Sequence, residues 1–501
     1  MTFIIQTPKK QFKNSNFMKK TNESAKCFSG IKNAKHSTPV TLRKTLFICF
    51  FSISFTLSYS QVVITNSNFS LGTTGRIGVG LSPNGEGNMW KPLNLSGQGS
   101  LGGRMEQNDY IDILPAIHFT PKIIGKDSTN VTFQMRLGMY SANGQFVGNV
   151  SSRSNNGLTF ILPEAYVEAR NIMGSKWSAW AGSRFRRYDD IHISDYFYFD
   201  DHSAQGFGVS HKNTELSMLM PASSDSTGVY PYNYEVTVAG ATNPAIRQRM
   251  VWIGEHNIIL KNNTIIKLLG EFHYVSANSR SASKNYPSDN GWVAGIKYNT
   301  PLKTTLPGSF NQLSARYGSG IANGGDNGNT FTWATYGAPD LEGKYTNAYS
   351  FTMVEHFLLN LSQKFSINGY GVFTKSKGGS SSPDKAEYFN GNQLYNQKMD
   401  FVVGFRSLYY ITNWFHLMEE VHYAVRKDGD NPEASMWKFS IVPTIVPLGK
   451  RDPWSRPHIR LVCTMARYND YARNNNYSPF LQVNQKRWGS FIGVKTEWWL
   501  F

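Results

Sequence analysis

The sequence predicts an all-β fold, a transmembrane antiparallel β-barrel, on three observations. The chain has 501 residues, of which 14% are aromatic and 17% charged, and its mean hydropathy is -0.38. Apolar and polar residues alternate along its segments, and turn-forming residues separate these segments. After residue 60, no apolar run approaches the roughly 20 residues that a membrane helix needs. Barrel strands alternate, which keeps the mean hydropathy low, and aromatic residues gather at both membrane interfaces.

Residues 1–60 have the character of a leader. They hold ten Lys or Arg and one Glu, so +9 of the net charge of +17 lies there and only +8 remains for the other 441 residues. A nucleic-acid partner therefore loses most of its support. Arg43-Lys44, the apolar stretch Leu46–Leu57 and the small Ser58 and Ser60 predict a secretory signal peptide cleaved before Gln61. A retained membrane anchor is the alternative.

Residues 61–501 form one predicted domain, because the composition does not change along them. The first residues of the chain suggest a start codon placed too early, since Met18-Lys19-Lys20 is a more ordinary beginning for a signal peptide. Removal of the leader leaves Cys463 as the only cysteine. The domain is thus expected to form no internal disulfide, and no metal or other cofactor is expected.

Strands are predicted where the period of two is strict. In Ile266–Tyr274, the polar Lys267, Glu271 and His273 occupy one face and apolar residues occupy the other. The segment Ile492–Leu500 alternates in the same way. The intervening turns differ widely in length, from 143–144 and 262–263 to 323–329 and 377–382. Short turns alternating with long loops are typical of outer-membrane barrels.

A soluble β-sandwich is the alternative fold for this pattern. The last residues, Trp498-Trp499-Leu500-Phe501, favour the barrel, because an aromatic residue at the end of an amphipathic strand is typical of outer-membrane barrels. The parity of the final segment predicts that Trp499 points into the lumen together with Lys495 and Glu497. Trp498 and Leu500 are predicted to point outward.

Three segments resemble the maltoporin family of sugar-specific porins. Trp180–Asp200 is similar to the family's WAGKRF strand and the constriction loop that follows it. Trp454–Arg460 is similar to its W-S/A-R-P-x-I-R strand, and Glu497–Trp499 to its E-I-W-W ending. The resemblance implies about 18 antiparallel strands, a homotrimer, and a narrowed pore in each subunit. It also implies diffusion of oligosaccharides along aromatic rings, with charged side chains opposite them.

The resemblance extends to single residues that would bind the sugar. Sugar rings have apolar faces that pack on aromatic rings and hydroxyls that seek charged partners. The implied positions are Tyr110 and Trp499 on the aromatic slide, Arg76 and Asp112 on the charged track, and Asp190, Asp195 and Asp200 in the constriction loop. Phe197 stands where the family has a loop tyrosine, and Arg187 lies one residue before the family's loop arginine, which is Tyr188 here. Thr74, Ala294 and Ile411 stand where the family has further slide aromatics, so a preference for maltodextrins is open.

The segment from about Tyr188 to Gly208 is predicted to fold inward and narrow the pore. Its charge density, which includes Asp189, Asp195 and Asp201, would not be tolerated on the lipid face of a barrel. The predicted partners are therefore an oligosaccharide, outer-membrane lipid and further copies of the chain. The predicted location is the outer membrane of a Gram-negative bacterium.

The function predicted from these features is facilitated diffusion of oligosaccharides. A barrel that binds surface polysaccharide, or assists capsule or glycan assembly without an open channel, is the alternative. Enzymatic activity is not expected, because the histidines of the domain have no G-x-S-x-G or H-E-x-x-H context.

Overall fold

The computed structural model describes residues 64–65, 68–119, 128–141, 158–187, 189–221, 248–277, 287–304, 306–324, 335–382, 385–389 and 392–500. The predicted leader and its cleavage site lie outside these residues. Among the described residues, no helix is long and apolar enough to cross a membrane.

Eighteen antiparallel strands close into a barrel; the alternation predicted the barrel, and the family resemblance implied the number of strands. They are β2 (Phe69–Leu81), β3 (Tyr110–Phe119), β4 (Asn130–Ser141), β5 (Leu158–Arg170), β6 (Trp177–Arg184), β9 (Ala204–His211), β10 (Thr214–Leu219), β11 (Arg249–Ile259), β12 (Ile265–Val275), β13 (Asp289–Pro301), β14 (Phe310–Gly320), β15 (Tyr349–Ser362), β16 (Phe365–Lys377), β19 (Gln397–Tyr410), β20 (Phe415–Asp428), β21 (Ala434–Ile445), β22 (His458–Tyr468) and β23 (Trp488–Leu500). Each pairs with the next along the chain, and β23 pairs with β2 to close the ring.

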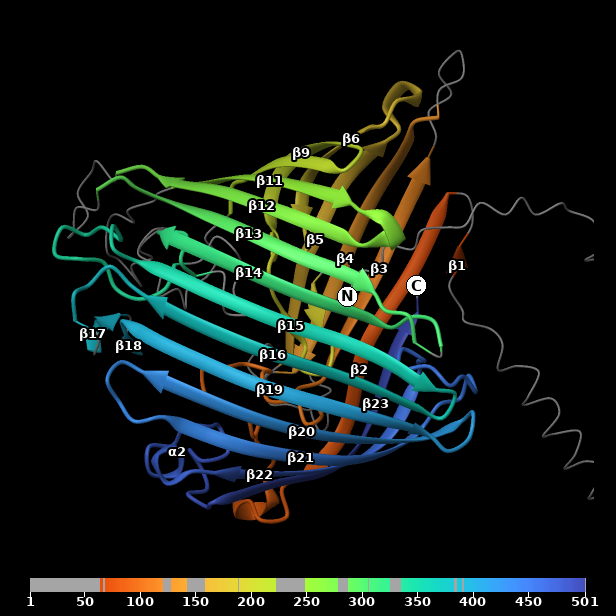
Figure 1. Cartoon of the computed structure of the whole chain (residues 1–501), viewed down its shortest axis with the longest axis vertical. Coiled ribbons are helices and arrows are strands. Elements are labelled where there is room, and N and C mark those ends of the chain that lie inside the picture. Colours follow the sequence, from red (N-terminus) through yellow and green to blue (C-terminus); the bar gives the residue numbers. More distant parts are fainter. Residues whose placement is uncertain are drawn as a thin grey trace, which may run out of the picture. The chain divides into compact units, whose positions relative to one another are not determined.

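Several short elements accompany the barrel strands. The two-residue β1 (Ile64–Thr65) pairs with β2, while β17 (Lys385–Phe389) and β18 (Asn392–Tyr395) form a separate hairpin. The short helix α2 (Asp470–Asn474) lies between β22 and β23, and a 3-10 turn at Glu86–Asn88 follows β2. Figure 1 shows β11 to β16 and then β19 to β21 following one another across one wall, with the hairpin of β17 and β18 and the helix α2 at the same end of these strands.

Alternation along each strand separates a charged interior from an apolar exterior. On β12, Lys267, Glu271 and His273 are buried inside, whereas Leu268 and Phe272 are 40% and 48% exposed on the outside. The face predicted to be polar is therefore the lumenal face. An exterior of this kind matches lipid, and an interior that holds charges requires partners for them.

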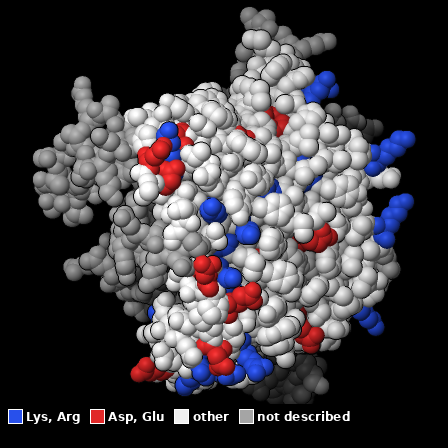
Figure 2. All heavy atoms as spheres, turned by 60° about the vertical axis from the view of Figure 1, so that its left-hand side comes forward, with Lys and Arg blue, Asp and Glu red and all other residues white. Residues whose placement is uncertain are grey.

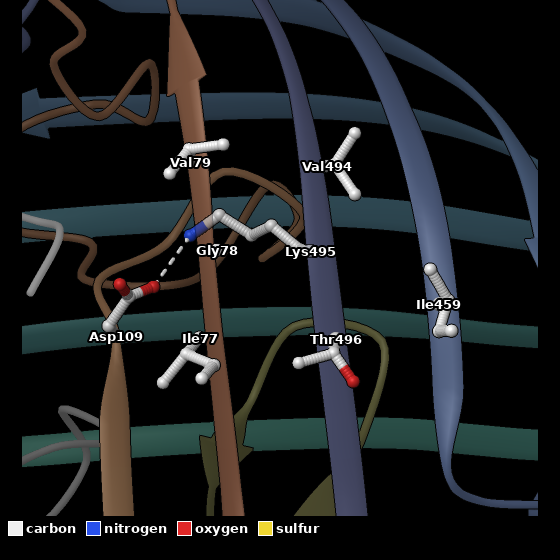
Figure 3. Close-up of a pocket in the computed structure, with 8 residues that line it drawn as sticks. All are labelled: Ile77, Gly78, Val79, Asp109, Ile459, Val494, Lys495 and Thr496. Atoms are coloured by element: carbon white, nitrogen blue, oxygen red, sulfur yellow. Dashed lines mark hydrogen bonds and ion pairs between the residues drawn. The ribbon is translucent and has the colours of Figure 1, made fainter. Parts of the chain in front are cut away.

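The wall is one backbone layer thick where β2 meets β23. Figure 3 shows a groove at this seam, which Ile77, Val79 and Val494 line on its apolar side. Lys495 extends past Gly78 and its ammonium group lies 3.2 Å from the carboxylate of Asp109. A side chain at position 78 would collide with the neighbouring strand, because a Cβ there would lie 2.7 Å from the Cα of Lys495. Glycine thus lets the two strands lie close together.

Segment 82–109, between β2 and β3, also folds into the barrel, which the sequence did not predict. Leu93, Leu95 and Leu101 are buried within it. The tyrosine hydroxyl of Tyr468 on β22 donates a hydrogen bond of 2.6 Å to the carbonyl of Leu93. Lys438 on β21 pairs with Glu106 at 2.5 Å. This segment, here called the first inner loop, packs against the lumenal face of the wall that contains β16 to β23.

Candidate functional site

Segment 185–203, here called the constriction loop, connects β6 to β9 through the barrel interior. It contains a small hairpin of β7 (Asp190–Ile191) and β8 (Tyr196–Phe197). The inward path confirms the prediction, although the predicted end at Gly208 was too late. Residues 204–208 belong to β9, because they pair with β6 and, from Gly206 onward, with β10. Tyr188 lies outside the described residues.

Buried ion pairs attach the constriction loop to the wall formed by β12 and β13. Lys297 pairs with Asp189, and Lys267 pairs with Asp200. Asp200 is fully buried. Although the resemblance placed Asp200 among the sugar-binding residues, the structure places its carboxylate against the wall, in an ion pair with Lys267.

The tip of the loop reaches the opposite side of the barrel. Arg104 of the first inner loop and Arg456 of the β21–β22 connection donate hydrogen bonds to His192 Nε2, at 2.6 and 2.7 Å. Arg76 on β2 lies 3.3 Å from the carboxylate of Asp195. Since the loop is attached at both sides, it crosses the lumen.

A single carboxylate, that of Glu497, binds the arginines that contact this tip. Glu497 on β23 accepts hydrogen bonds from Arg104 at 2.6 Å and from Arg456 at 3.0 Å, and it also pairs with Arg460. All four side chains are at most 6% exposed. Three guanidinium groups therefore depend on one buried anion. Arg456, Arg460 and Glu497 belong to the segments that carried the family resemblance, but no sequence pattern indicates that they meet.

The wall of β2 to β4 faces the constriction loop with aromatic and charged side chains. The Arg76 guanidinium lies 5.0 Å from the centre of the Tyr110 ring. Asp112 and Arg136 form an ion pair at 2.6 Å. Tyr140 is the cross-strand partner of Tyr110 and is 37% exposed. This wall thus offers ring faces beside charged groups.

The constriction loop also presents aromatic and charged side chains, and these face the wall of β2 to β4. Arg187 stacks on two rings, with its guanidinium carbon 4.1 Å from the centre of Phe185 and 4.2 Å from that of Phe197. Arg136 stacks on Phe185 as well, at 4.3 Å, so the loop and the wall meet here. We call the set the constriction patch: Arg76, Tyr110, Asp112, Arg136, Tyr140, Phe185, Arg187, Asp195 and Phe197. Six of these nine are candidates that the sequence named.

Trp499 lies beside the loop tip and points into the lumen, as its parity predicted. Its ring is 4.7 Å from the ring of His192, and the Arg456 guanidinium lies 4.1 Å from its centre. The neighbouring Trp498 faces the other way and donates a hydrogen bond to Thr73 at 3.2 Å. Trp499 is therefore next to the constriction but outside the patch.

Asp190 lies in the hairpin of the loop, where its carboxylate is 3.7 Å from His192 Nδ1. Burial, together with the nearby Asp195, raises the pKa of Asp190 to about 7. Asp190 therefore carries less than a full negative charge at neutral pH. Asp195, which is 26% exposed at its side chain, is the more accessible carboxylate.

The loop anchor at His202 predicts a pH-dependent change. Burial opposes the charge on His202, but two carboxylates outweigh burial and raise its pKa from 6.5 to about 9: that of Glu255, 3.3 Å from Nδ1, and that of Glu271, hydrogen-bonded to Nε2 at 3.1 Å. Anchoring by this charge is thus complete below pH 6.5 and is lost as the pH rises through about 9. We expect current fluctuations in single-channel recordings to increase over this range. His202→Gln should abolish the dependence, and an identical pH profile in both proteins would contradict it.

In Figure 2 the molecule is turned so that the left-hand side of Figure 1 comes forward. Acidic and basic side chains lie together over the middle and lower part of the face drawn there. The described residues contain no group of three or more His, Cys, Asp or Glu side chains arranged to hold a metal ion.

Comparison with known proteins places this architecture in a family. Residues 69–499 match the family model described as LamB porin. The chain belongs to the LamB porin family. It is 23% identical over 462 residues to a maltoporin of Vibrio cholerae serotype O1 (El Tor Inaba N16961), covering 88% of this chain and 97% of that protein. A maltoporin of the classical Ogawa 395 strain gives the same identity, with 96% of its length covered.

Likeness to solved structures is distant. The channel DcaP of Acinetobacter baumannii aligns with a TM-score of 0.43 at 9% identity, covering 87% of this chain and 98% of that one. OmpF of Salmonella typhi, solved with daunomycin, aligns with a TM-score of 0.40 at 10% identity, covering 87% and 100%.

Membership of the LamB porin family identifies the chain as an outer-membrane sugar porin at the level of the family. It also places the protein in the outer membrane of a Gram-negative bacterium. The homologues of this LamB porin are channels rather than enzymes.

Three members of the constriction patch in this LamB porin, Arg136, Tyr140 and Phe185, were not predicted from the sequence. Tyr140 is the register partner of Tyr110, and Gly138 that of Asp112, so Arg136 shares the lumenal side of β4 with Tyr140 through its even spacing from both. That parity could be read from the sequence, but the pairing of the two strands could not. Phe185 follows the last residue of β6, where the strand pattern no longer fixes the side on which a residue lies.

Proposed function

We propose that the protein passes oligosaccharides by facilitated diffusion between the constriction loop and the wall of β2 to β4. The constriction patch carries this proposal, because it sets aromatic rings beside charged hydrogen-bonding groups in the barrel interior. Tyr110 and Phe197 would contact the apolar faces of the sugar, and Arg76, Asp112 and Asp195 its hydroxyls. Weak binding at successive positions permits net movement.

Maltodextrins are the first permeants to test, because the curated relatives are named maltoporins. The aromatic slide is shorter than the family pattern. Thr74 faces the lumen without a ring, and Ala294 is exposed on the outer face of β13. We therefore expect Trp499 and the patch to provide most of the aromatic contact. We assign Asp200 an anchoring role through Lys267, and Asp190 a position beside the tip without direct sugar contact.

Trp499→Ala tests the slide. Loss of one stacking surface should weaken block of the channel by maltotriose by about 1–3 kcal/mol. Ion conductance and assembly should stay close to normal, because the Trp499 ring packs against the tip of the constriction loop and does not take part in the backbone pairing of the strands. Trp437, an exposed tryptophan on the outer face of β21, provides the control through Trp437→Ala. Unchanged sugar block in Trp499→Ala, together with poor folding, would assign this residue to packing.

We also propose that three copies associate in the membrane and that lipid covers the remaining exterior. Family resemblance supports the trimer, and the apolar outer wall supports lipid contact. Cross-linking in native membranes should stop at trimers. Residues 1–60 are proposed to be removed on export, which N-terminal sequencing of the mature protein beginning at Gln61 would establish.

A barrel that binds surface glycan without an open channel is the second candidate function. Two inner loops favour it, because both occupy the lumen with buried side chains. Planar-bilayer recordings distinguish the two functions. Discrete channels that glucans block support the porin, whereas glucan binding without conductance supports the alternative.

A further inference from the structure

Arg187 differs from the other arginines around the constriction in its lack of a close carboxylate. Arg186, its neighbour in the chain, binds Glu215 at 2.8 and 3.0 Å and Glu255 at 2.5 Å. Arg136 has Asp112 at 2.6 Å. The guanidinium of Arg187 lies 3.9 Å from the carboxylate of Asp201, which is beyond hydrogen-bonding distance.

Asp201 is poorly placed to neutralise Arg187. Its other carboxylate oxygen accepts a hydrogen bond of 2.7 Å from the hydroxyl of Ser203, which fixes its orientation. Burial raises the pKa of the Asp201 carboxyl. In the part of the chain that the structure describes, Arg187 Nε has no hydrogen-bond partner. Among the described residues, the guanidinium of Arg187 therefore has no carboxylate within hydrogen-bonding distance.

The same guanidinium is held in a fixed orientation. Phe185 and Phe197 stack on it at 4.1 and 4.2 Å, and its side chain is 22% exposed. A planar guanidinium that is already immobilised loses little conformational entropy when it binds a carboxylate through two hydrogen bonds. A second guanidinium, that of Arg136, packs on the same ring but is paired with Asp112.

We propose that Arg187 is a binding site for an anionic group on the permeating sugar, so that acidic oligosaccharides are preferred over neutral ones. The inference rests on the proposed function and defines its substrate class. A uronic acid carboxylate matches the two-pronged guanidinium, and a sulfate ester offers the same charge. The aromatic rings on each side then contact the apolar face of the same sugar unit.

Single-channel recordings with two trisaccharides test the preference. Trigalacturonate, which is acidic, should half-block the wild-type channel at a concentration lower than that of neutral maltotriose by about tenfold or more. Raising the salt to about 1 M should reduce the difference, because the screening length falls to about 3 Å. If a sulfated trisaccharide blocks the channel as well as trigalacturonate does, the site recognises charge alone. If it blocks more weakly, the geometry of the carboxylate also contributes. Both outcomes support an anionic permeant.

Variants of Arg187 locate the effect. Arg187→Gln should weaken trigalacturonate block about tenfold more than it weakens maltotriose block, and so remove the preference for the acidic sugar. Arg187→Lys keeps the positive charge and should retain part of the preference, but it should lose part of the trigalacturonate block, because lysine cannot form the two-pronged contact. Arg467→Gln, on β22 with its side chain stacked on Trp488 of β23, is the matched control and should change neither sugar's block.

The inference is overturned if maltotriose blocks the wild-type channel as well as trigalacturonate, or if Arg187→Gln weakens both sugars equally. Failure of the proposed function gives a different result, namely no conductance at all. In that case, calorimetric titration of the detergent-solubilised protein with trigalacturonate still decides the matter. Binding that Arg187→Gln abolishes would support the anion site, and no binding would refute it.

Discussion

Glu497→Gln is expected to destabilise the folded barrel by about 3–5 kcal/mol and to free the tip of the constriction loop. The variant keeps the shape of the side chain but removes the buried anion that Arg104, Arg456 and Arg460 share. Three guanidinium groups would then lie close together with no counter-charge at their centre. Removal of one partner from a buried pair costs far more than the pair contributes net, because the remaining charge stays desolvated.

The temperature at which the folded band disappears on SDS gels measures this loss. Asp470→Asn serves as the control, because Asp470 forms an ion pair with Arg487 at the surface and its side chain is 62% exposed. Such exposed pairs contribute about 0–1 kcal/mol, so this variant should melt close to the wild type. Equal melting temperatures for Glu497→Gln and wild type would show that the cluster is not essential to stability.

Replacement of Asp190–Phe199 by a short Gly-Ser linker is expected to raise single-channel conductance on the order of twofold or more, because the crossing loop narrows the lumen. The design keeps Asp189 and Asp200, so that Lys297 and Lys267 retain their partners. A simple deletion through both aspartates would leave two buried lysines unpaired and confuse pore size with stability.

Sugar block should disappear in the same variant, because Asp195 and Phe197 of the patch are removed with the loop. Substitution of the exposed Asn474 and Asn475 by glycine, in the connection between β22 and β23, controls for changes in a loop outside the constriction. Unchanged conductance in the linker variant would mean that the loop does not limit the current and that the narrowest point lies elsewhere.

The local alternation of apolar and polar residues in the sequence predicted the strands and the two faces of each strand. The pattern in Ile266–Tyr274 fixed which side of β12 is charged, and the parity of the last strand fixed the direction of Trp499. Both depend only on the geometry of an extended chain, in which successive side chains point to opposite sides. The inward path of the loop followed from charge, since charged side chains avoid lipid. The number of strands, in contrast, came from resemblance to a family.

Only the tertiary structure decided which lumenal residues meet. Closure of β23 on β2 places Glu497 beside Arg456 and Arg460, and the inward path of the first inner loop brings Arg104 to the same carboxylate. The two aspartates Asp195 and Asp200 are equivalent in sequence terms, yet one reaches Arg76 and the other is buried against Lys267. Strand register and barrel closure set these distances, and both are determined by pairings between segments far apart in the chain. A period of two fixes the side on which a residue lies, whereas the opposite wall fixes its partner.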